Sequence, residues 1–358
     1  MDTLLMSSLL NTKPSLHSMT NISFTGPRQT DDLCSEDAFL ALIDRCFPSA
    51  HQDVLLGRGD DCAVVACRES LCVTSDLFLE DAHFRRAYFA PGDIGFKALA
   101  VNISDITAMG AKPLGFILNL MVPRQLERGF WEAFFQGMAE LAAEHDLYLA
   151  GGDLSGAPYL GVAVTIWGER PLGGRFLRRG QARPGDVLFL VGEIGLAKLG
   201  LTLLEGGGHV PEESSAVYAA QDYPVAVQAH LRPTLHSDAA LALSRTGTVR
   251  GLMDVSDGLA RDLPRFLGPG QGCALALQPE MLHPELHVFA RKSGLDAAEF
   301  AVLGGEDYAL LGAVAARDWA MLREHIPAVR RLGEVTAGPG IQLNGKEMRS
   351  QGFDHFHR

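Results

Sequence analysis

Residues 97–105 read Lys97-Ala98-Leu99-Ala100-Val101-Asn102-Ile103-Ser104-Asp105. We predict that they lie inside a helix that runs from Asp93, its N-cap, to Met109 and is ended by a glycine. The helix is largely apolar, so an unpaired carboxylate at Asp105 would be costly to bury. An acid in this setting indicates a positive partner, and hard cations such as Mg²⁺ prefer oxygen ligands.

Other acids lie in short frames with glycine or apolar neighbours, each typical of a strand end or a tight turn. The frames are Gly59-Asp60-Asp61, Thr74-Ser75-Asp76, Gly151-Gly152-Asp153, Asp254-Val255-Ser256-Asp257-Gly258 and Gly304-Gly305-Glu306-Asp307. Aspartate is rarely buried unless it is paired or bound to a metal. Together with Asp105, these frames predict several Mg²⁺ ions that hold phosphates.

Each frame also has a structural explanation when it is taken alone. The pair Asp60-Asp61 fits an Asx-type turn between two strands. Ser256 or Asp257 fits the N-cap of a helix, which stabilises by about 1 kcal/mol but leaves Asp254 unexplained. The pair Glu306-Asp307 resembles another strand-to-helix junction. The joint occurrence of the frames, in this order, favours the metal interpretation.

The bulk composition is that of an ordinary globular enzyme. Its 358 residues exceed what one hydrophobic core usually serves, so we expect two domains. A net charge of −12 argues against a nucleic-acid partner, and no stretch approaches the ~18 apolar residues of a membrane span. The six cysteines form no Cys-x-x-Cys pair, and Cys62, Cys67 and Cys72 fit buried thiols. A reducing, cytoplasmic location is therefore expected.

The alternation of expected helices and strands indicates an α/β (α+β) fold. We expect helices over 35–47, 93–109, 130–145, 196–204 and 237–244, and strands over 116–122, 147–150, 160–167 and 187–191. The helix over 130–145 carries an aromatic stripe at helical spacing, which we assign to the core. The expected division is an N-terminal domain over 31–170, a basic linker over 171–186 and a C-terminal α/β domain over 187–358. Residues 1–30 are expected to be a disordered extension or a mis-assigned start, with Met19 as an alternative initiator.

Three familiar catalytic signatures are absent from the sequence: the Walker A loop, the kinase catalytic loop and the Gly-x-Ser-x-Gly nucleophile elbow. A protein of this kind that uses ATP must hold the phosphates through metal bridges and local basic groups. Arg175, Arg178 and Arg179 are candidates for a phosphate contact, although the run also fits a solvated linker. His83 lies in a polar frame and fits either a binding role or an ordinary surface position.

These stretches together resemble the thiamine-monophosphate kinase family, within the superfamily that includes aminoimidazole-ribotide synthetase and selenophosphate synthetase. The matching stretches are 57–61, 74–76, 97–105, 108–111, 151–153, 183–186, 254–259, 304–308 and 352–356. The resemblance implies a two-domain PurM-like architecture whose N-terminal domain contributes to a dimer-forming β-barrel. It also implies a Mg²⁺-assisted transferase that phosphorylates thiamine monophosphate to thiamine diphosphate by direct in-line transfer from ATP.

The resemblance further implies a role for individual residues. The metal ligands would be Asp61, Thr74, Ser75, Asp76, Asp105, Asp153, Asp254 and Asp257, of which Asp105, Asp254 and Asp257 are also assigned to catalysis. ATP would meet Gly152, Arg179 and Ser256, and thiamine monophosphate would meet His83, Glu306 and Phe353. Several Mg²⁺ ions are implied as cofactors, K⁺ is a further candidate, and the expected assembly is a homodimer.

The chain departs from the family pattern at several positions. Leu154 and Ser155 stand where relatives usually carry threonines, Asp81 replaces a common glycine, and an aromatic residue expected near His145 is missing. Two alternatives therefore remain open at this point. One is another ATP-using activity of the superfamily, such as ribotide ligation, and the other is a nucleotide-binding regulatory protein without turnover.

Overall fold

The computed structural model describes residues 36–48, 51–52, 54–56, 58, 63–66, 70–206 and 220–348. All of them belong to one contiguous unit of contacts over Leu33–Arg358, so the two sheets within it are described together. The expected extension over 1–30, the acidic pair Asp60-Asp61 and Phe353 lie outside the described residues.

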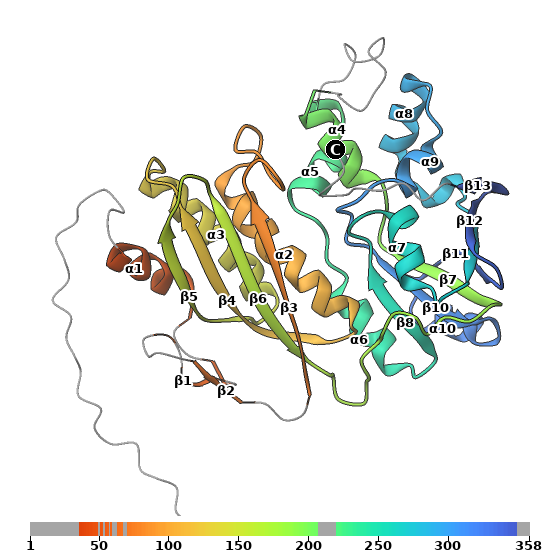
Figure 1. Cartoon of the computed structure of the whole chain (residues 1–358), viewed down its shortest axis with the longest axis horizontal. Helices are drawn as coiled ribbons and strands as arrows, with labels where there is room; N and C mark the ends of the chain where they lie inside the picture. Colours follow the sequence, from red (N-terminus) through yellow and green to blue (C-terminus); the bar gives the residue numbers. More distant parts are fainter. Residues whose placement is uncertain are drawn as a thin grey trace, which may run out of the picture. The chain divides into compact units, whose positions relative to one another are not determined.

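The N-terminal half is built on a four-stranded sheet in the order β3-β6-β4-β5 (Figure 1). The strands are β3 (Leu71–Leu79), β4 (Lys112–Val122), β5 (Tyr148–Gly156) and β6 (Gly161–Glu169). Only the β4–β5 pair is parallel, because α3 crosses over between these two strands. Helices α2 (Pro91–Ala108) and α3 (Arg128–Glu144) cover one face, and α1 (Glu36–Cys46) packs on α3. The sheet is open, so no closed barrel is formed by the described residues of this chain.

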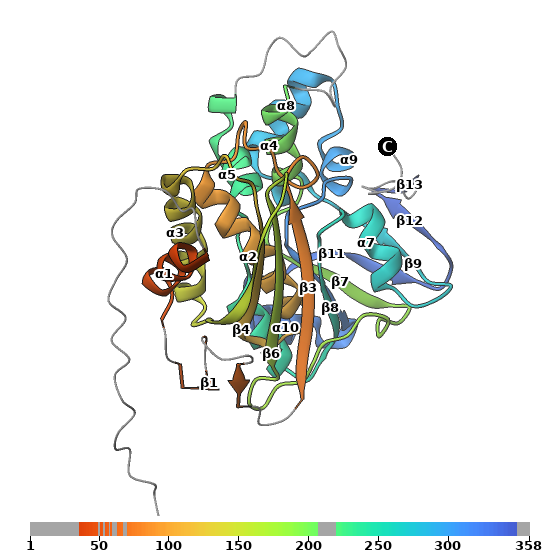
Figure 2. The same ribbon diagram turned by 60° about the vertical axis from the view of Figure 1, so that its left-hand side comes forward.

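The C-terminal half contains a seven-stranded sheet in the order β13-β12-β9-β11-β7-β10-β8 (Figure 2). Its strands are β7 (Asp186–Val191), β8 (Val249–Asp254), β9 (Gly272–Leu275), β10 (Leu310–Ala315), β11 (Arg330–Thr336), β12 (Gly340–Leu343) and β13 (Lys346–Met348). Its helices are α4 (Leu196–Leu204), α5 (Pro224–Leu231), α6 (Ser237–Arg245), α7 (Leu259–Phe266), α8 (Pro284–Ser293), α9 (Ala297–Val302) and α10 (Trp319–His325). A small separate pair, β1 (Val54–Leu56) and β2 (Val64–Val65), lies in the N-terminal half.

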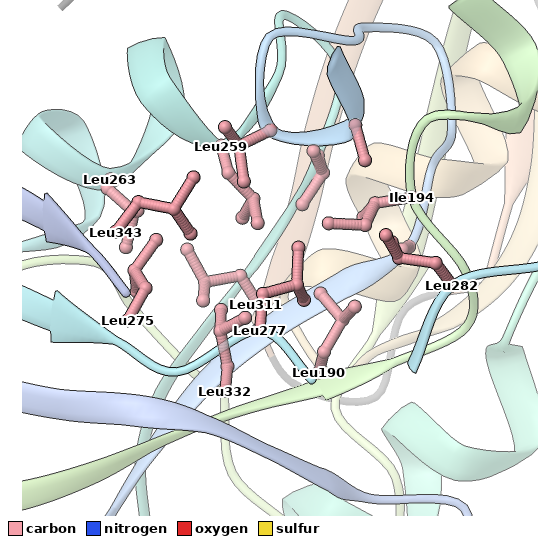
Figure 3. Packing of buried hydrophobic residues seen from close by; sticks show 14 of the residues in the cluster. Leu190, Ile194, Leu259, Leu263, Leu275, Leu277, Leu282, Leu311, Leu332 and Leu343 are labelled. Atoms are coloured by element: carbon pink, nitrogen blue, oxygen red, sulfur yellow. The ribbon is translucent and has the colours of Figure 1, made fainter. Parts of the chain in front are cut away.

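Strand β7 shows why the second sheet is covered on both faces. All six of its residues are buried, as expected for a central strand with helices on each side. Leu188 and Leu190 point into one core with α4, α7 and α8, while Phe189 and Val191 point into another with α6 and α10. Figure 3 shows part of the first of these cores. The expected α/β class is therefore confirmed in both halves.

Helices α2 and α3 pack closely because glycines line their contact. A Cβ atom on Gly137 would lie 2.0 Å from the carbonyl oxygen of Gly92, and one on Gly95 would lie 2.0 Å from that of Phe134. The aromatic stripe of α3, assigned to the core from the sequence, is buried around this contact as predicted.

We expect Gly137→Ala to destabilise the protein by about 2–3 kcal/mol, because the added methyl group forces two helix backbones apart. Urea unfolding followed by circular dichroism measures the change. Gly129→Ala is the matched control, since it lies in the same helix with no atom within 4 Å of the added Cβ. Equal stability of the two variants would contradict the prediction.

Three local predictions were wrong. Helix α2 begins at Pro91 with Ala90 as its N-cap, and Asp93 lies in the first turn, where its carboxylate pairs with Arg232 at 2.6 Å. Strand β5 was expected to end before the Gly-Gly-Asp frame but continues through it to Gly156. The frame at Glu306-Asp307 leads into strand β10 and not into a helix.

None of the described helices is both long enough and apolar enough to cross a membrane.

Candidate functional site

Helix α2 carries the site because it contacts both halves of the protein. It packs on β3, β4 and β6 on one side and reaches β8, α5 and α6 on the other. A helix buried on several sides is apolar nearly all round, as the sequence of α2 is, and its few polar residues have specific partners. The polar residues over 97–105 therefore lie between the two sheets.

Two hydrogen bonds join α2 to the flanking strands through carboxylates. Thr74 on β3 donates its hydroxyl to Oδ2 of Asp105 at 2.6 Å. Ser104 donates its hydroxyl to Oδ2 of Asp254, at the end of β8, at 2.8 Å. The frames that are far apart in the sequence are thus brought together on one helix.

Asp76, Asp105 and Asp254 all have raised pKa values, because nearby positive charge does not offset their burial. Burial, together with the charge of Asp105, raises the pKa of Asp76 to about 6. Burial and then Asp105 raise the pKa of Asp254, which is only 2% exposed, to about 7. The pKa of Asp105 is also raised by burial, although Thr74 and Arg179 act in the opposite direction. A bound cation would relieve this desolvation and mutual repulsion.

The donor set fits Mg²⁺ in its chemistry. Carboxylate and hydroxyl oxygens from Asp76, Asp105, Asp254 and Thr74 are the ligands that this hard cation prefers. Within the described ranges, no three His, Cys, Asp or Glu side chains already form a group that could hold an ion. Mg²⁺ usually keeps several waters and phosphate oxygens in its coordination shell, so one or two protein carboxylates per ion suffice.

Arg179 is the arginine of the basic run whose charge acts on the acids. The charge of its exposed guanidinium lowers the pKa of both Asp105 and Asp254. Arg175 instead donates to the carbonyl oxygen of Val249. These interactions distinguish Arg179 from Arg175.

Strand alternation separates the Thr74-Ser75-Asp76 frame. Thr74 points toward α2, whereas Ser75 lies on the opposite face and bonds to Val164 O at 3.0 Å and Thr165 Oγ1 at 2.9 Å. Asp153 is exposed on β5, the far edge of the same sheet, with Ser155 donating to it at 3.4 Å. The structure thus groups Thr74 with Asp105 and leaves Ser75 and Asp153 apart from them.

Gly152, beside Asp153, has a structural requirement of its own. A Cβ at this position would lie 1.7 Å from the carbonyl oxygen of Leu118, so only glycine permits this approach of β5 to β4.

Asp257, in the loop after β8, is held by basic residues of α7. Its Oδ2 lies 2.5 Å from Nη1 of Arg265 and 3.6 Å from Nε of Arg261. Its backbone N–H donates to the buried carboxyl group of Asp262 at 3.0 Å. Helix α7 takes Gly258 as its N-cap and has no side-chain cap, so the capping explanation of this frame is wrong.

Glu306 is joined to the same site from the C-terminal half. Its backbone N–H donates to the carbonyl oxygen of Ser256 at 2.7 Å. The pKa of the neighbouring Tyr308 is raised well above its ordinary value by burial and then by the charges of Glu306, Asp254, Asp76 and Asp105. Tyr308 therefore lies within electrostatic range of all four acids.

His83 lies in the turn after β3 and is half-buried. Its Nδ1 accepts a hydrogen bond from the backbone N–H of Leu79 at 3.0 Å, and its ring lies 6.0 Å from that of Phe78. This contact fixes the direction of the ring. The hydrogen bond also fits a structural role in the turn, so the binding role of His83 stays a prediction.

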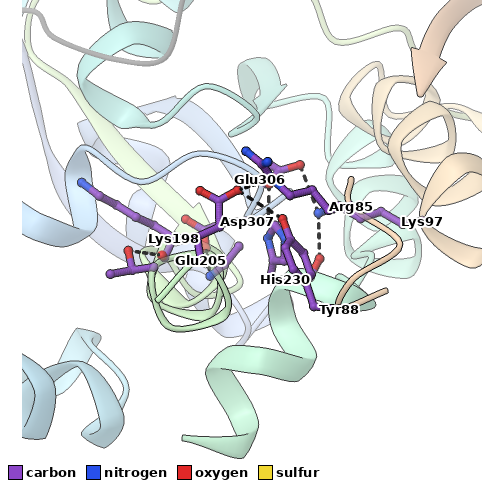
Figure 4. A network of polar contacts seen from close by, with 10 residues as sticks. Arg85, Tyr88, Lys97, Lys198, Glu205, His230, Glu306 and Asp307 are labelled. Carbon is purple, nitrogen blue, oxygen red and sulfur yellow. Dashed lines mark hydrogen bonds and ion pairs between the residues drawn. The ribbon is translucent and has the colours of Figure 1, made fainter. Parts of the chain in front are cut away.

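Sequence reasoning missed two residues that contact Glu306. Lys97 and His230 are buried with the carboxylate of Glu306 between them, as Figure 4 shows. A lysine in the middle of an apolar helix was the available signal for Lys97. No local pattern around His230 separates it from an ordinary helical residue.

Comparison with known proteins gives a consistent result. Residues 59–169 match the family described as AIR synthase related protein, N-terminal domain, and residues 183–346 match the corresponding C-terminal domain. The thiamine-monophosphate kinase of Bacillus subtilis (strain 168) is 35% identical over 325 residues, which cover 86% of this chain and 95% of that protein.

Solved structures agree with the sequence comparison. The thiamine-monophosphate kinase from Stenotrophomonas maltophilia K279a has a TM-score of 0.70 at 30% identity, covering 87% of this chain and 96% of its own. The complex of AaThiL with AMPPCP and TMP has a TM-score of 0.67 at 27% identity, covering 93% of this chain and 100% of its own. The mixed α/β, two-domain PurM-like chain therefore belongs to the thiamine-monophosphate kinase family.

Proposed function

We propose that this protein phosphorylates thiamine monophosphate to thiamine diphosphate, with ATP as the phosphoryl donor. The observation that carries the proposal is the group Asp76, Asp105 and Asp254, one buried and two half-buried acids from both halves that lie on or against α2. The related complex of AaThiL with AMPPCP, an ATP analogue, and TMP supports the same pair of substrates.

The chemistry needs charge neutralisation more than it needs a base. The acceptor is a phosphate oxygen, already anionic at neutral pH, so no proton has to be removed before it attacks the γ-phosphorus. The barrier lies in bringing two polyanions together and aligning them for in-line transfer. A site made of acids and hydroxyls suits that requirement.

Asp76, Asp105, Asp254 and Thr74 would hold Mg²⁺ in this scheme. The ions, when bound, supply the positive charge that neutralises the phosphates. Arg179 would contact phosphate oxygens from its position beside Asp105 and Asp254.

The remaining site residues are assigned by resemblance and are part of the same proposal. Asp61, Ser75, Asp153 and Asp257 would hold further Mg²⁺ ions, with Ser75 and Asp153 at a place apart from Asp105, and K⁺ is a further candidate ion. Gly152 and Ser256 would contact ATP, and His83, Glu306 and Phe353 would contact thiamine monophosphate. Ser256 and Glu306 are hydrogen-bonded neighbours, which supports adjacent binding of the two substrates.

The domain limits and location complete the proposal. We place the N-terminal domain at 31–170, the linker at 171–186 and the C-terminal domain at 187–358, with 1–30 as an extension. Cys46, Cys72 and Cys273 are free thiols, which supports a reducing cytoplasmic location.

We further propose a homodimer formed through the uncovered face of the first sheet. Val73, Leu77 and Ile117 are 63%, 55% and 36% exposed on this face, and β3 is an edge strand. Apolar side chains gathered on one uncovered face are typical of an interaction surface. A second copy packed there would supply the strands of the dimer-forming β-barrel.

We expect Val73→Lys to shift the protein from dimer to monomer, because a charge would be buried at the contact. Analytical ultracentrifugation measures the mass at micromolar concentration. Leu172→Lys is the control, since Leu172 is 95% exposed outside this face. A wild-type protein that sediments as a monomer would refute the homodimer.

The proposed reaction is tested by a coupled assay of ADP release with Mg²⁺ and thiamine monophosphate, followed by product identification. We expect acceptor-dependent ADP release with thiamine diphosphate formed. ATP binding without thiamine diphosphate would refute the proposed reaction.

A further inference from the structure

The backbone at Glu306 is strained and is held by the loop after β8. Glu306 has φ +64° and Tyr308 has φ +51°, a left-handed conformation that residues other than glycine adopt at a cost. The segment is kept there by Glu306 N–H to Ser256 O at 2.7 Å and Tyr308 N–H to Val255 O at 3.0 Å. Strain of this kind at one carboxylate indicates that the direction of its side chain matters.

Each carboxylate oxygen of Glu306 has a basic side chain beside it. Lys97 Nζ lies 3.0 Å from Oε1, and His230 Nδ1 lies 3.3 Å from Oε2. The Lys97 side chain is fully buried and that of His230 is 1% exposed, whereas that of Glu306 is 28% exposed. The Glu306 side chain is therefore the accessible member of this group, and the remaining lone pairs of its carboxylate are available to a ligand.

Lys97 is itself fixed in place. Its ammonium group also donates to the backbone carbonyl oxygen of His230 at 2.7 Å and lies 5.5 Å from the centre of the Phe89 ring. The contacts come from α2, α5 and the loop before β10, so three separate elements fix one carboxylate. The contacts with Lys97 and His230 restrict the rotation of the Glu306 side chain.

Stability is a poor explanation for this arrangement. The desolvation of a buried ion pair offsets most of its attraction, so apolar residues of similar size often stabilise a protein equally well. Burying Lys97 and straining the backbone at Glu306 both cost free energy. A binding role for Glu306 explains both, because binding requires a fixed orientation of its carboxylate.

We infer that Lys97 is a positioning residue: it holds Glu306 so that the outward lone pairs of the carboxylate accept hydrogen bonds from the thiamine moiety of the acceptor. His230 lies beside the second oxygen. The inference rests on the proposed function, because it takes Glu306 as a contact of the acceptor.

The test is the steady-state kinetics of Lys97→Met, with thiamine monophosphate and ATP varied separately. We expect the KM for thiamine monophosphate to rise about tenfold or more, while the KM for ATP changes less than about twofold. A general structural defect would raise both constants. Lys198→Met is the matched control, because Lys198 is also partly buried beside an acid, Asp307, but does not pair with Glu306.

A double-mutant cycle decides whether Lys97 acts through Glu306. In a Glu306→Gln background, Lys97→Met should change the KM for thiamine monophosphate by less than about twofold, because the partner charge is already gone. The double variant also leaves no unpaired buried charge, so it remains informative if Lys97→Met alone does not fold. Independent, additive effects of the two replacements would overturn the inference.

Failure of the inference is distinguishable from failure of the proposed function. A wild-type enzyme that makes thiamine diphosphate, with an unchanged KM for thiamine monophosphate in Lys97→Met, overturns only the positioning role. A wild-type protein that forms no thiamine diphosphate overturns the proposed function and this inference with it.

Discussion

Asp105→Asn is expected to reduce turnover by at least about 10²-fold, because loss of even an indirect partner of a metal site commonly costs 10–100-fold. Asp105 is the acid that accepts from Thr74 at 2.6 Å, and its charge raises the pKa of both Asp76 and Asp254. Asparagine has the same shape and can still accept the Thr74 hydrogen bond. The replacement therefore removes a negative charge and not packing.

Thiamine diphosphate formation at saturating ATP measures this effect, and circular dichroism reports the fold. Asp146→Asn is the control, since Asp146 is a 64% exposed acid at φ +54°, a conformation that asparagine readily adopts. Because Asp146 itself is well exposed, its contacts with His51 and Lys112 contribute little stability. Turnover of Asp105→Asn within a few-fold of wild type would remove Asp105 from the metal site.

Asp254→Asn is expected to abolish activity and yet stabilise the metal-free protein at pH 8 by about 2 kcal/mol. The pKa of Asp254 is about 7 in the folded protein against an ordinary value of 3.8. Between these two values the folded state binds more protons than the unfolded state, so stability falls as the pH rises toward 7. Above pH 7 the buried carboxylate is charged and its full cost is present.

Urea unfolding in EDTA at pH 6 and pH 8 tests the sign. The wild type should lose stability between the two pH values, and Asp254→Asn should lose less. Mg²⁺ should stabilise the wild type at pH 8 and the variant less, because a ligand that binds only the folded state stabilises it.

Asp186→Asn is a control for which we expect the opposite change in stability. Asp186 is 4% exposed, and its carboxylate accepts from the Arg183 N–H at 2.9 Å and from Arg250 at 3.3 Å. Loss of that charge leaves Arg250 without its partner, so this variant should be less stable at both pH values. A destabilised Asp254→Asn at pH 8 would contradict the electrostatic account of the site.

Local patterns in the sequence were sufficient for much of the fold. The aromatic stripe of α3 predicted a core face, and α4 was predicted with its observed limits because its apolar spacing is regular. The sequence of β5 hid the length of the strand, since the glycines that predicted a turn at 151–152 are accommodated within the β4–β5 ladder. Asp93 was misassigned because its long-range partner Arg232 cannot be read from neighbouring residues.

For the acids of the site, too, some features could be predicted from local sequence and others depended on the tertiary structure. The sequence by itself determined that Asp76, Asp105, Asp254 and Glu306 occupy special frames, because a carboxylate among apolar residues is costly wherever it is buried. Which of them share an environment was decided by tertiary structure. Helix α2 brings β3 and β8 to its two sides, and strand alternation turns Ser75 away from Thr74.

Lys97 and His230 show most clearly which contacts cannot be predicted from the sequence. They are 133 positions apart in the chain, and only the packing of α2 against α5 and the β10 loop brings them to Glu306. The attraction between two charges weakens as the distance between them in space increases. A sequence records only the order of residues along the chain. Local composition therefore determined which residues needed partners, and the tertiary fold alone decided which partners they have.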